Sequence, residues 1–308
     1  MTSRPRGGLG ALAWAARLAA VATVAYFGWV AVEGSRRIVR PQRRPFTPAE
    51  GEPATPDDLG LAFEEVAFAT DDGVTLTGWL IPAARQTGAA VILLHGYSWH
   101  RLPWLKAFVP WLQRRYNVLQ FDFRGHGLSD DAPITLGTNE QRDVAAAVRF
   151  LSERGLGPLA LMGISMGGSV AIMAAPDLPV AAVVADAAYA DLSDPIRNRM
   201  REIGFPFARL ASRVAIAAAH LRAGARLRSP VDRVAQLAPR ALLVISPEED
   251  QLVSASQSRR LFERAGEPKE LLVIPGAGHA DAHAVGGETY EATVLAFLDR
   301  FLVSRSPV

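Results

Sequence analysis

From residue 63 to residue 302, short apolar runs typical of buried strands alternate with stretches of helical periodicity. This alternation restricts the chain to α/β architectures, because strands joined through helical crossovers pair in parallel and are covered by those helices. The hairpin-like Asp71-Asp72-Gly73 between the first two runs indicates an antiparallel start. We therefore predict a doubly wound, mostly parallel sheet of eight strands, at residues 63–69, 75–81, 89–94, 117–121, 159–164, 180–186, 241–246 and 270–274. The helices are expected at residues 104–115, 138–154, 166–174, 254–265 and 288–302.

The segment 191–230 interrupts this alternation, because it has only helical pattern and lies between two predicted strands. An insertion there would cover the carboxyl edge of the sheet, where open α/β folds bind ligands. Its eight arginines outnumber its three acidic residues, and apolar residues at helical spacing lie between them. We expect a small helical cap whose apolar face lines the site. Its basic face is either solvated or rests on an anionic membrane surface.

A long apolar run, residues 9–32, precedes the alternating region. As a helix it spans about 36 Å at ~1.5 Å per residue, and the hydrocarbon core of a bilayer is about 30 Å thick. Arg17 is the one charged residue in this run. It lies near enough to the amino end for its side chain to reach the membrane–water interface. We predict that residues 1–33 form a transmembrane anchor. A cleaved signal peptide and a peripheral amphipathic helix are the alternatives.

Residues 34–60 contain five prolines among arginines and acidic residues. This composition predicts an extended tether that leads to a folded domain at residues 61–308. More arginines follow the apolar run than precede it, so the positive-inside rule favours a cytoplasmic side for that domain. The arginines before the run are Arg4 and Arg6, and those after it are Arg36, Arg37, Arg40, Arg43 and Arg44.

Composition excludes several kinds of site and partner. The 308 residues include no cysteine, so disulfides and thiolate zinc sites are impossible and a nucleophile must be Ser, Thr, Lys or a carboxylate. The net charge is only +2, which does not indicate binding to nucleic acid. Histidines and carboxylates do not recur at the spacing of metal ligands. We expect no metal and no organic cofactor.

The segment GISMGG at residues 163–168 follows a predicted strand and opens a predicted helix. A nucleophile on such a tight turn needs small neighbours, and Gly163 and Gly167 supply them around Ser165. The helix amino terminus would favour the alkoxide of Ser165, and the N–H of Met166 would point at a developing oxyanion. A glycine-rich turn with an incidental serine is the alternative.

A second strand ends in Leu94-His95-Gly96-Tyr97. Gly96 permits a tight turn after which the N–H of Tyr97 faces the same site, as a second oxyanion donor. His95 precedes the turn, so we interpret it as a residue that braces the loop rather than as a catalyst.

The remaining candidates follow two later strands. Hydrolysis by a serine requires a base within hydrogen-bond reach and an acid that holds the base in one tautomer. His279 is the candidate base and Asp250 the candidate acid, and the chain order Ser, Asp, His is typical of this kind of fold. The alternative acids are Asp186 and Glu249, and the alternative base is His283.

Together with these residues, the segment FDFRGHGLS at residues 121–129 resembles the α/β-hydrolase superfamily. The resemblance is greatest to its serine aminopeptidase-like and monoacylglycerol lipase-like esterase branches, and it covers roughly residues 61–304. It implies that the segment 121–129 is a structural loop and that His126 is not catalytic. This chain differs from the family pattern after the seventh strand, where Ser246-Pro247 and two additional carboxylates stand, so the alternative acids stay open.

These features predict a membrane-anchored serine hydrolase that cleaves small-molecule or lipid esters through an acyl-enzyme. A peptidase or amidase of the same fold is one alternative, and a noncatalytic, membrane-tethered binding protein is another. Acyl length, the choice between ester and amide, and oligomeric state are not encoded in these motifs.

Overall fold

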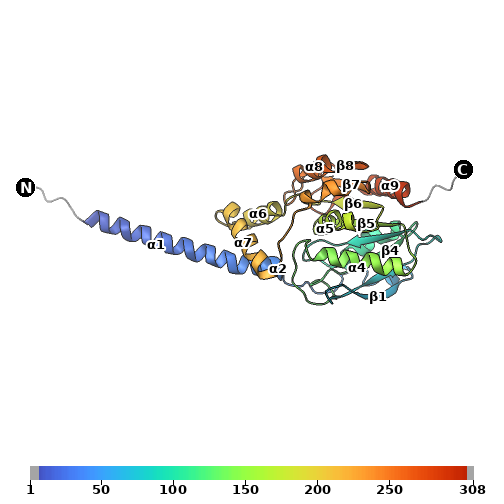
Figure 1. Ribbon diagram of the computed structural model, residues 1–308, viewed down its shortest axis with the longest axis horizontal. Coiled ribbons are helices and arrows are strands. Elements are labelled where there is room, and N and C mark those ends of the chain that lie inside the picture. The colour runs from blue at the N-terminus through green and yellow to red at the C-terminus, as the bar shows by residue number, and fades with distance from the viewer. Residues whose placement is uncertain (1–6, 304–308) are drawn as a thin grey trace, which may run out of the picture.

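The computed structural model of the chain describes residues 7–303, and its central element is a single sheet of eight strands (Figure 1). The strand order is β1-β2-β4-β3-β5-β6-β7-β8. β2 is antiparallel to both β1 and β4, and every other pairing is parallel. The mostly parallel sheet with an antiparallel start is therefore confirmed. The strands are β1 Glu64–Ala69, β2 Thr75–Ile81, β3 Ala90–Leu94, β4 Asn117–Phe121, β5 Leu159–Ile164, β6 Ala182–Asp186, β7 Ala241–Pro247 and β8 Lys269–Ile274.

Helices cover both faces of the sheet, because the central strands are apolar on both sides. One face packs against α4 (Glu140–Glu153), α5 (Met166–Ala174) and α8 (Ala255–Arg264). The other packs against α3 (Leu102–Leu112) and α9 (Ala282–Leu302). α9 begins six residues earlier than the predicted helix 288–302, and it kinks at Gly287, whose φ of 46° is left-handed.

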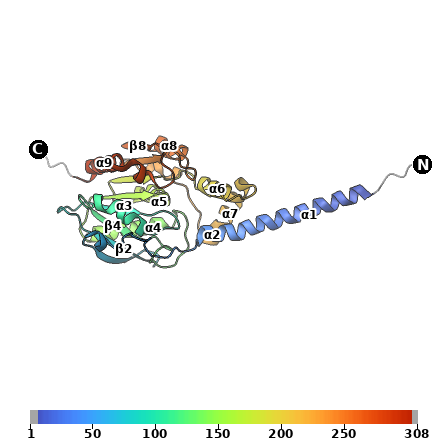
Figure 2. The ribbon, with the colours of Figure 1, turned by 180° about the vertical axis from the view of Figure 1, so that it is seen from behind.

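The insertion at residues 191–230 contains two helices, α6 (Ser193–Glu202) and α7 (Ala208–Ala223). Figures 1 and 2 show them projecting from one end of the sheet, beside the N-terminal helix. This end of the sheet is its carboxyl edge, because the insertion begins just after the last residue of β6 and ends before the first residue of β7. The cap helices therefore lie next to the turns that follow the parallel strands.

The N-terminal helix α1 (Gly7–Trp29) extends away from the rest of the molecule (Figure 1). It continues through a π-helical turn, Val30–Gly34, into the short helix α2 (Ser35–Val39). Only 6% of its most apolar 18-residue window is buried, so the protein itself does not cover this hydrophobic surface. This helix is the one candidate membrane span among residues 7–303. Arg4 and Arg6, used above to predict orientation, lie outside the described residues.

The extended tether predicted for residues 34–60 is wrong in its first part. Ile38 and Val39 are helical and buried in the core, because they pack against the cap helix α7. Gly34 permits this packing, since a Cβ there would lie 2.9 Å from the Cβ of Ala215. The prolines that suggested an extended segment begin only at Pro41, beyond the end of α2.

The segment after α2 has little regular structure but lies against the domain. The carbonyl of Pro45 is 3.1 Å from Nε2 of His100, and the ring of Phe46 contacts those of Trp79 and His100. A short 3₁₀ turn, Pro56–Leu59, then leads into β1. Residues 40–60 are thus attached to the sheet domain at defined points.

The loop after β4 is held by a buried arginine. Arg124, only 2% exposed, donates to the carboxylates of Asp143 and Asp72 at 2.8 Å each. Burial raises the pKa of Asp143 to about 7, although the Arg124 guanidinium acts in the opposite direction. Such a network depends on every partner, because an unpaired buried charge is strongly unfavourable.

We expect Arg124→Met to lower the free energy of unfolding by about 3–5 kcal/mol, because it leaves Asp143 buried without its partner. Urea denaturation measures this change. The matched control is Arg154→Met, which removes an exposed ion pair with Glu64 and should change stability by less than about 1 kcal/mol. Equal losses in the two variants would contradict a structural role for the Arg124 network.

Candidate active site

Ser165 occupies a strained turn between β5 and α5. Its φ of 55° and ψ of −116° are rare for a residue with a side chain, so the surrounding packing must hold it. A Cβ on Gly163 would lie 2.2 Å from the carbonyl carbon of Gly167, and a Cβ on Gly167 would lie 2.1 Å from the oxygen of Leu94. The N–H of Ser165 donates to the carbonyl of Asp186 at 2.8 Å. The serine is therefore presented at the amino terminus of α5.

His279, in the loop after β8, joins Ser165 to Asp250. Its Nε2 lies 3.0 Å from Oγ of Ser165, and its Nδ1 lies 2.7 Å from Oδ2 of Asp250. With a carboxylate at Nδ1, that nitrogen carries the proton and Nε2 accepts from the serine hydroxyl. The other oxygen of Asp250 accepts the N–H groups of Leu252 and Val253, both at 2.8 Å. These bonds hold the carboxylate in place, and its side chain is fully buried.

The alternative acids make hydrogen bonds to groups other than His279 or are exposed. Asp186, at the end of β6, accepts a hydrogen bond from the hydroxyl of Tyr290 at 2.9 Å, and burial raises the pKa of its carboxyl to about 7. Glu249 has an exposed side chain, and its backbone N–H donates to Ala277. Neither carboxylate hydrogen-bonds the ring of His279.

The alternative base also lies elsewhere. Nε2 of His283 is 3.0 Å from Glu291 within α9, and the imidazole stacks on Trp111. The structure thus brings Asp250, His279 and Ser165 together and leaves His283 outside this group.

The loop after β3 approaches the nucleophile closely. A Cβ on Gly96 would lie 3.7 Å from the Cβ of Ser165, which is van der Waals contact. Met166 is the first residue of α5, where an N–H has no acceptor in its own helix. Within residues 7–303, the N–H groups of Tyr97 and Met166 donate to no other protein group. Two backbone donors are therefore available beside Ser165.

Two buried histidines brace this loop. His95 lies with Nδ1 2.8 Å from the carbonyl of Gly96, and its Nε2 accepts from the N–H of Phe123 at 3.0 Å. His126 accepts from the N–H of Ser98 at 3.1 Å. Burial lowers the pKa of both imidazoles to about 3, so both rings are neutral near pH 7. They connect the loop after β3 to the loop after β4.

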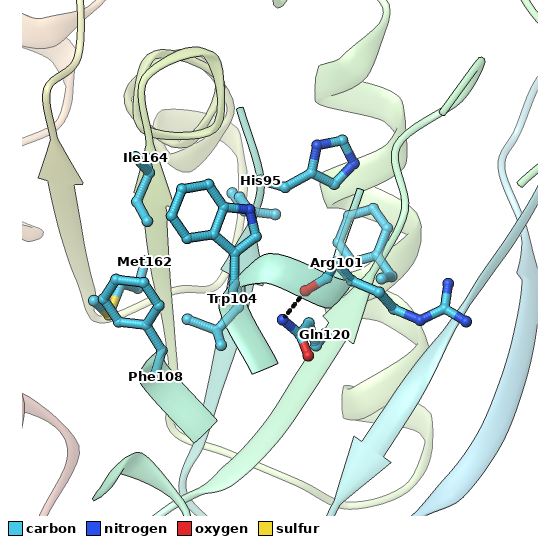
Figure 3. Close-up of a pocket in the computed structure, with 10 residues that line it drawn as sticks. His95, Arg101, Trp104, Phe108, Gln120, Met162 and Ile164 are labelled. Atoms are coloured by element: carbon cyan, nitrogen blue, oxygen red, sulfur yellow. Dashed lines mark hydrogen bonds between the residues drawn. The ribbon is translucent and has the colours of Figure 1, made fainter. Parts of the chain in front are cut away.

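A very small cavity lies behind this loop, between Trp104 and Gln120 (Figure 3). Gln120 donates to the carbonyl of Arg101 at 2.7 Å along its wall. The cavity measures about 10 Å³, which is close to the space that one water molecule needs. It is too small for an organic substrate.

A much larger cavity, about 440 Å³, opens directly onto Ser165 and His279. Much of its wall comes from three parts of the chain: the loop after β3, the cap helix α6 and the segment 29–38. The lining is mostly apolar, as is typical of sites for organic ligands. No residue of the segment 29–38 was predicted to line the site, although the apolar pair Ile38-Val39 shortly before Pro41 was a signal for packing.

The model of the alpha/beta hydrolase family matches residues 91–292. The chain belongs to this family. The matched region runs from β3 into α9 and includes Ser165, Asp250 and His279.

In the part of the chain that the structure describes, no three His, Asp or Glu side chains are grouped so that they could bind a metal ion.

Relatives extend the similarity beyond the matched region. YfhR of Escherichia coli O157:H7, an uncharacterized protein, is 28% identical over 250 residues, which cover 76% of this chain and 80% of YfhR. The polyketide transferase grgF of a Penicillium species is 28% identical over 267 residues, covering 72% of this chain and 90% of that protein.

Among solved structures, the esterase Pf2001 of Pyrococcus furiosus superposes with a TM-score of 0.71 at 27% identity. The match covers 84% of this chain and 98% of the esterase. The structure of GrgF superposes with a TM-score of 0.65 at 27% identity, over 79% of this chain and all of GrgF. These neighbours agree with a hydrolase fold.

Proposed function

We propose that this protein is a membrane-anchored serine hydrolase that cleaves carboxylic esters with an apolar acyl chain. The observation that carries the proposal is the hydrogen-bonded series Ser165–His279–Asp250 at the inner end of a large apolar cavity. The named esterase among the structural neighbours supports the same reaction class.

The reaction proceeds through an acyl-enzyme. His279 removes the proton from Oγ of Ser165, and Oγ forms a bond to the ester carbonyl carbon. The N–H groups of Tyr97 and Met166 donate to the oxyanion of the tetrahedral intermediate. His279 then gives the proton to the leaving alkoxide as the carbon–oxygen bond breaks. A water molecule, deprotonated by His279, releases the acyl group in the same way and restores the free Ser165 hydroxyl.

The cavity favours an ester of a lipid-like acid over a peptide. Ile196, Met200 and Ile203 face the space beyond Ser165, and such walls bind acyl chains rather than polar peptide groups. A peptidase or amidase would use the same three residues, so the two readings differ in substrate and not in the chemistry at Ser165.

The exposure of α1 supports membrane anchoring. A helix whose apolar surface is left almost wholly uncovered by its own protein needs a nonaqueous environment. A cleaved signal peptide fits less well, because Val30 and Val39, just after the apolar helix, are buried in the core. The excess of arginines after the span favours a cytoplasmic domain.

We expect Ser165→Ala to reduce hydrolysis of p-nitrophenyl esters by about 10⁴-fold to 10⁶-fold, because the nucleophile is lost. Labelling by a fluorophosphonate probe should disappear at the same time, while the thermal unfolding midpoint stays close to that of the parent. A folded parent protein that never labels would favour a noncatalytic binding protein. A parent that turns over aminoacyl anilides faster than esters would favour the peptidase.

We expect Asp250→Asn to reduce turnover by about 10⁴-fold, because an amide at this position no longer holds the Nδ1–H tautomer of His279. Glu249→Gln is the matched control: it neutralises the neighbouring, exposed carboxylate and should leave turnover within about threefold. Steady-state kinetics on one p-nitrophenyl ester measures both. If the Glu249 variant is the inactive one, the acid has been assigned to the wrong residue.

We expect the full chain, with its N-terminal helix intact by mass spectrometry, to stay in the membrane pellet after washing with alkaline carbonate. Integral helices resist this treatment because their apolar surface stays in the bilayer. Release into the supernatant would indicate a peripheral helix, and a mass reduced by the first ~30 residues would indicate a cleaved signal peptide.

A further inference from the structure

We propose that residues 29–38, at the end of the N-terminal helix, form one wall of the acyl-binding cavity, so that the substrate is a bilayer lipid ester entering between this helix and the cap. The inference rests on the proposed function, because it takes Ser165 as the nucleophile and α1 as a membrane helix. It adds the source of the substrate and a binding role for the anchor.

The wall is continuous with the reacting groups. Trp29, Gly34 and Ile38 line the same 440 Å³ cavity that contains Ser165 and His279. The same cavity is lined by apolar residues of α6 and the segment after it, namely Ile196, Met200, Ile203 and Phe205. An acyl chain bound at Ser165 would therefore extend between the anchor and the cap.

The helix end is attached firmly enough to act as a wall. The ring of Trp29 stacks on that of Phe205, with centroids 5.6 Å apart and planes inclined by 17°. Tyr26 donates its hydroxyl proton to the carbonyl of Pro206 at 2.6 Å. One turn further on, Arg222 of α7 donates to Oγ of Ser35 at 2.9 Å. These contacts fix the anchor to the cap on both sides of the π-helical turn.

The same helix end is also attached to the nucleophile side of the cavity. The hydroxyl of Tyr97 donates to the carbonyl of Arg37, near the end of α2. Tyr97 belongs to the loop after β3, which approaches Ser165 at Gly96. The end of the N-terminal helix thus contacts both the cap and the loop after β3, and both of these also line the cavity.

The rim of the cavity suits contact with a bilayer. Trp29 and Ile203 line the cavity and are 50% and 52% exposed, although both are large and apolar. Trp29 is the last residue of α1 and stacks on Phe205 of the cap insertion, and both ribbon views show α1 continuing outward from the cap (Figures 1 and 2). A bilayer around α1 would begin at this rim, with Trp29 at the interface that tryptophan prefers.

This arrangement gives an acyl chain a route that avoids water. Extraction of a long chain from a bilayer into water is unfavourable in proportion to its apolar area. A mouth that opens at the membrane surface, with one wall made by the membrane helix, removes that step. A soluble acyl ester arriving from water would use the same cavity, so the experiment must distinguish the two sources.

The first experiment tests the wall, with the full chain reconstituted in phosphatidylcholine vesicles. We expect Ile38→Trp, which fills the cavity, to lower the ratio of kcat/KM for p-nitrophenyl dodecanoate to that for p-nitrophenyl acetate at least tenfold. The matched control is Val32→Trp, because Val32 is 61% exposed and is not among the residues of this segment that line the cavity. The control should leave the ratio within about twofold.

A second variant covers the case in which Ile38→Trp does not fold. Ile38→Ala enlarges the cavity, and we expect it to shift the preferred acyl chain to a greater length by two or more carbons. An unchanged chain-length profile in the variants that fold would overturn the proposed wall. Fluorophosphonate labelling of the parent distinguishes failure of the proposed hydrolase from failure of the proposed wall. Absence of labelling refutes the hydrolase. Normal labelling with an unchanged chain-length profile in the variants refutes only the wall.

The second experiment tests the source of the substrate. Dioleoylglycerol is placed either in the same vesicles as the protein or in separate vesicles that are then mixed with protein-containing ones. With lateral entry, we expect hydrolysis in the shared vesicles to be at least tenfold faster than in the mixed population. Equal initial rates in the two arrangements would overturn entry from the bilayer and indicate uptake from water.

Discussion

The close approach of two glycines at the turn around Ser165 is the steric constraint on which the site depends. A Cβ at Gly163 or Gly167 would collide with neighbouring backbone. Because both residues are glycines, β5 can turn directly into α5 against the end of β3. The turn holds Ser165 at a positive φ, a conformation that the surrounding sheet must stabilise. Because β3 and β5 are adjacent and parallel, their carboxyl ends bring the loop at Gly96 beside the serine.

Around this turn, the remaining groups are arranged by the sheet order. β7 and β8 follow β6 toward one edge, and the loops after them carry Asp250 and His279 back to Ser165. The cap leaves the sheet after β6, so it covers the carboxyl edge from which these loops emerge. The N-terminal helix then packs on the cap through Gly34 and Ala215 and extends the cavity away from the sheet. The proposed catalytic residues, the large cavity and the candidate membrane span thus meet at the carboxyl edge of the sheet.

Much of this organisation was predictable. The eight strands appear within two residues of their predicted ends, because buried parallel strands form short apolar runs that are separated by helical periodicity. The residues around Ser165 were identifiable because the turn requires glycines at both sides. Asp250 was harder to identify, since Glu249 is adjacent in sequence and Asp186 also ends a strand. Hydrogen bonding to His279, which depends on the path of two distant loops, distinguishes Asp250 from both.

By itself, the sequence determined the α/β sheet, the turn at Ser165, the helical character of residues 191–230 and the apolar length of the N-terminal helix. Each of these is a local property, visible in composition, spacing or periodicity. Only the tertiary structure decided that residues 34–39 are helical and packed on α7 rather than extended, and that the segment 29–38 lines the cavity at Ser165. The physical reason is that this packing joins segments about 180 residues apart, and no local pattern records which distant apolar surface a short helix will cover.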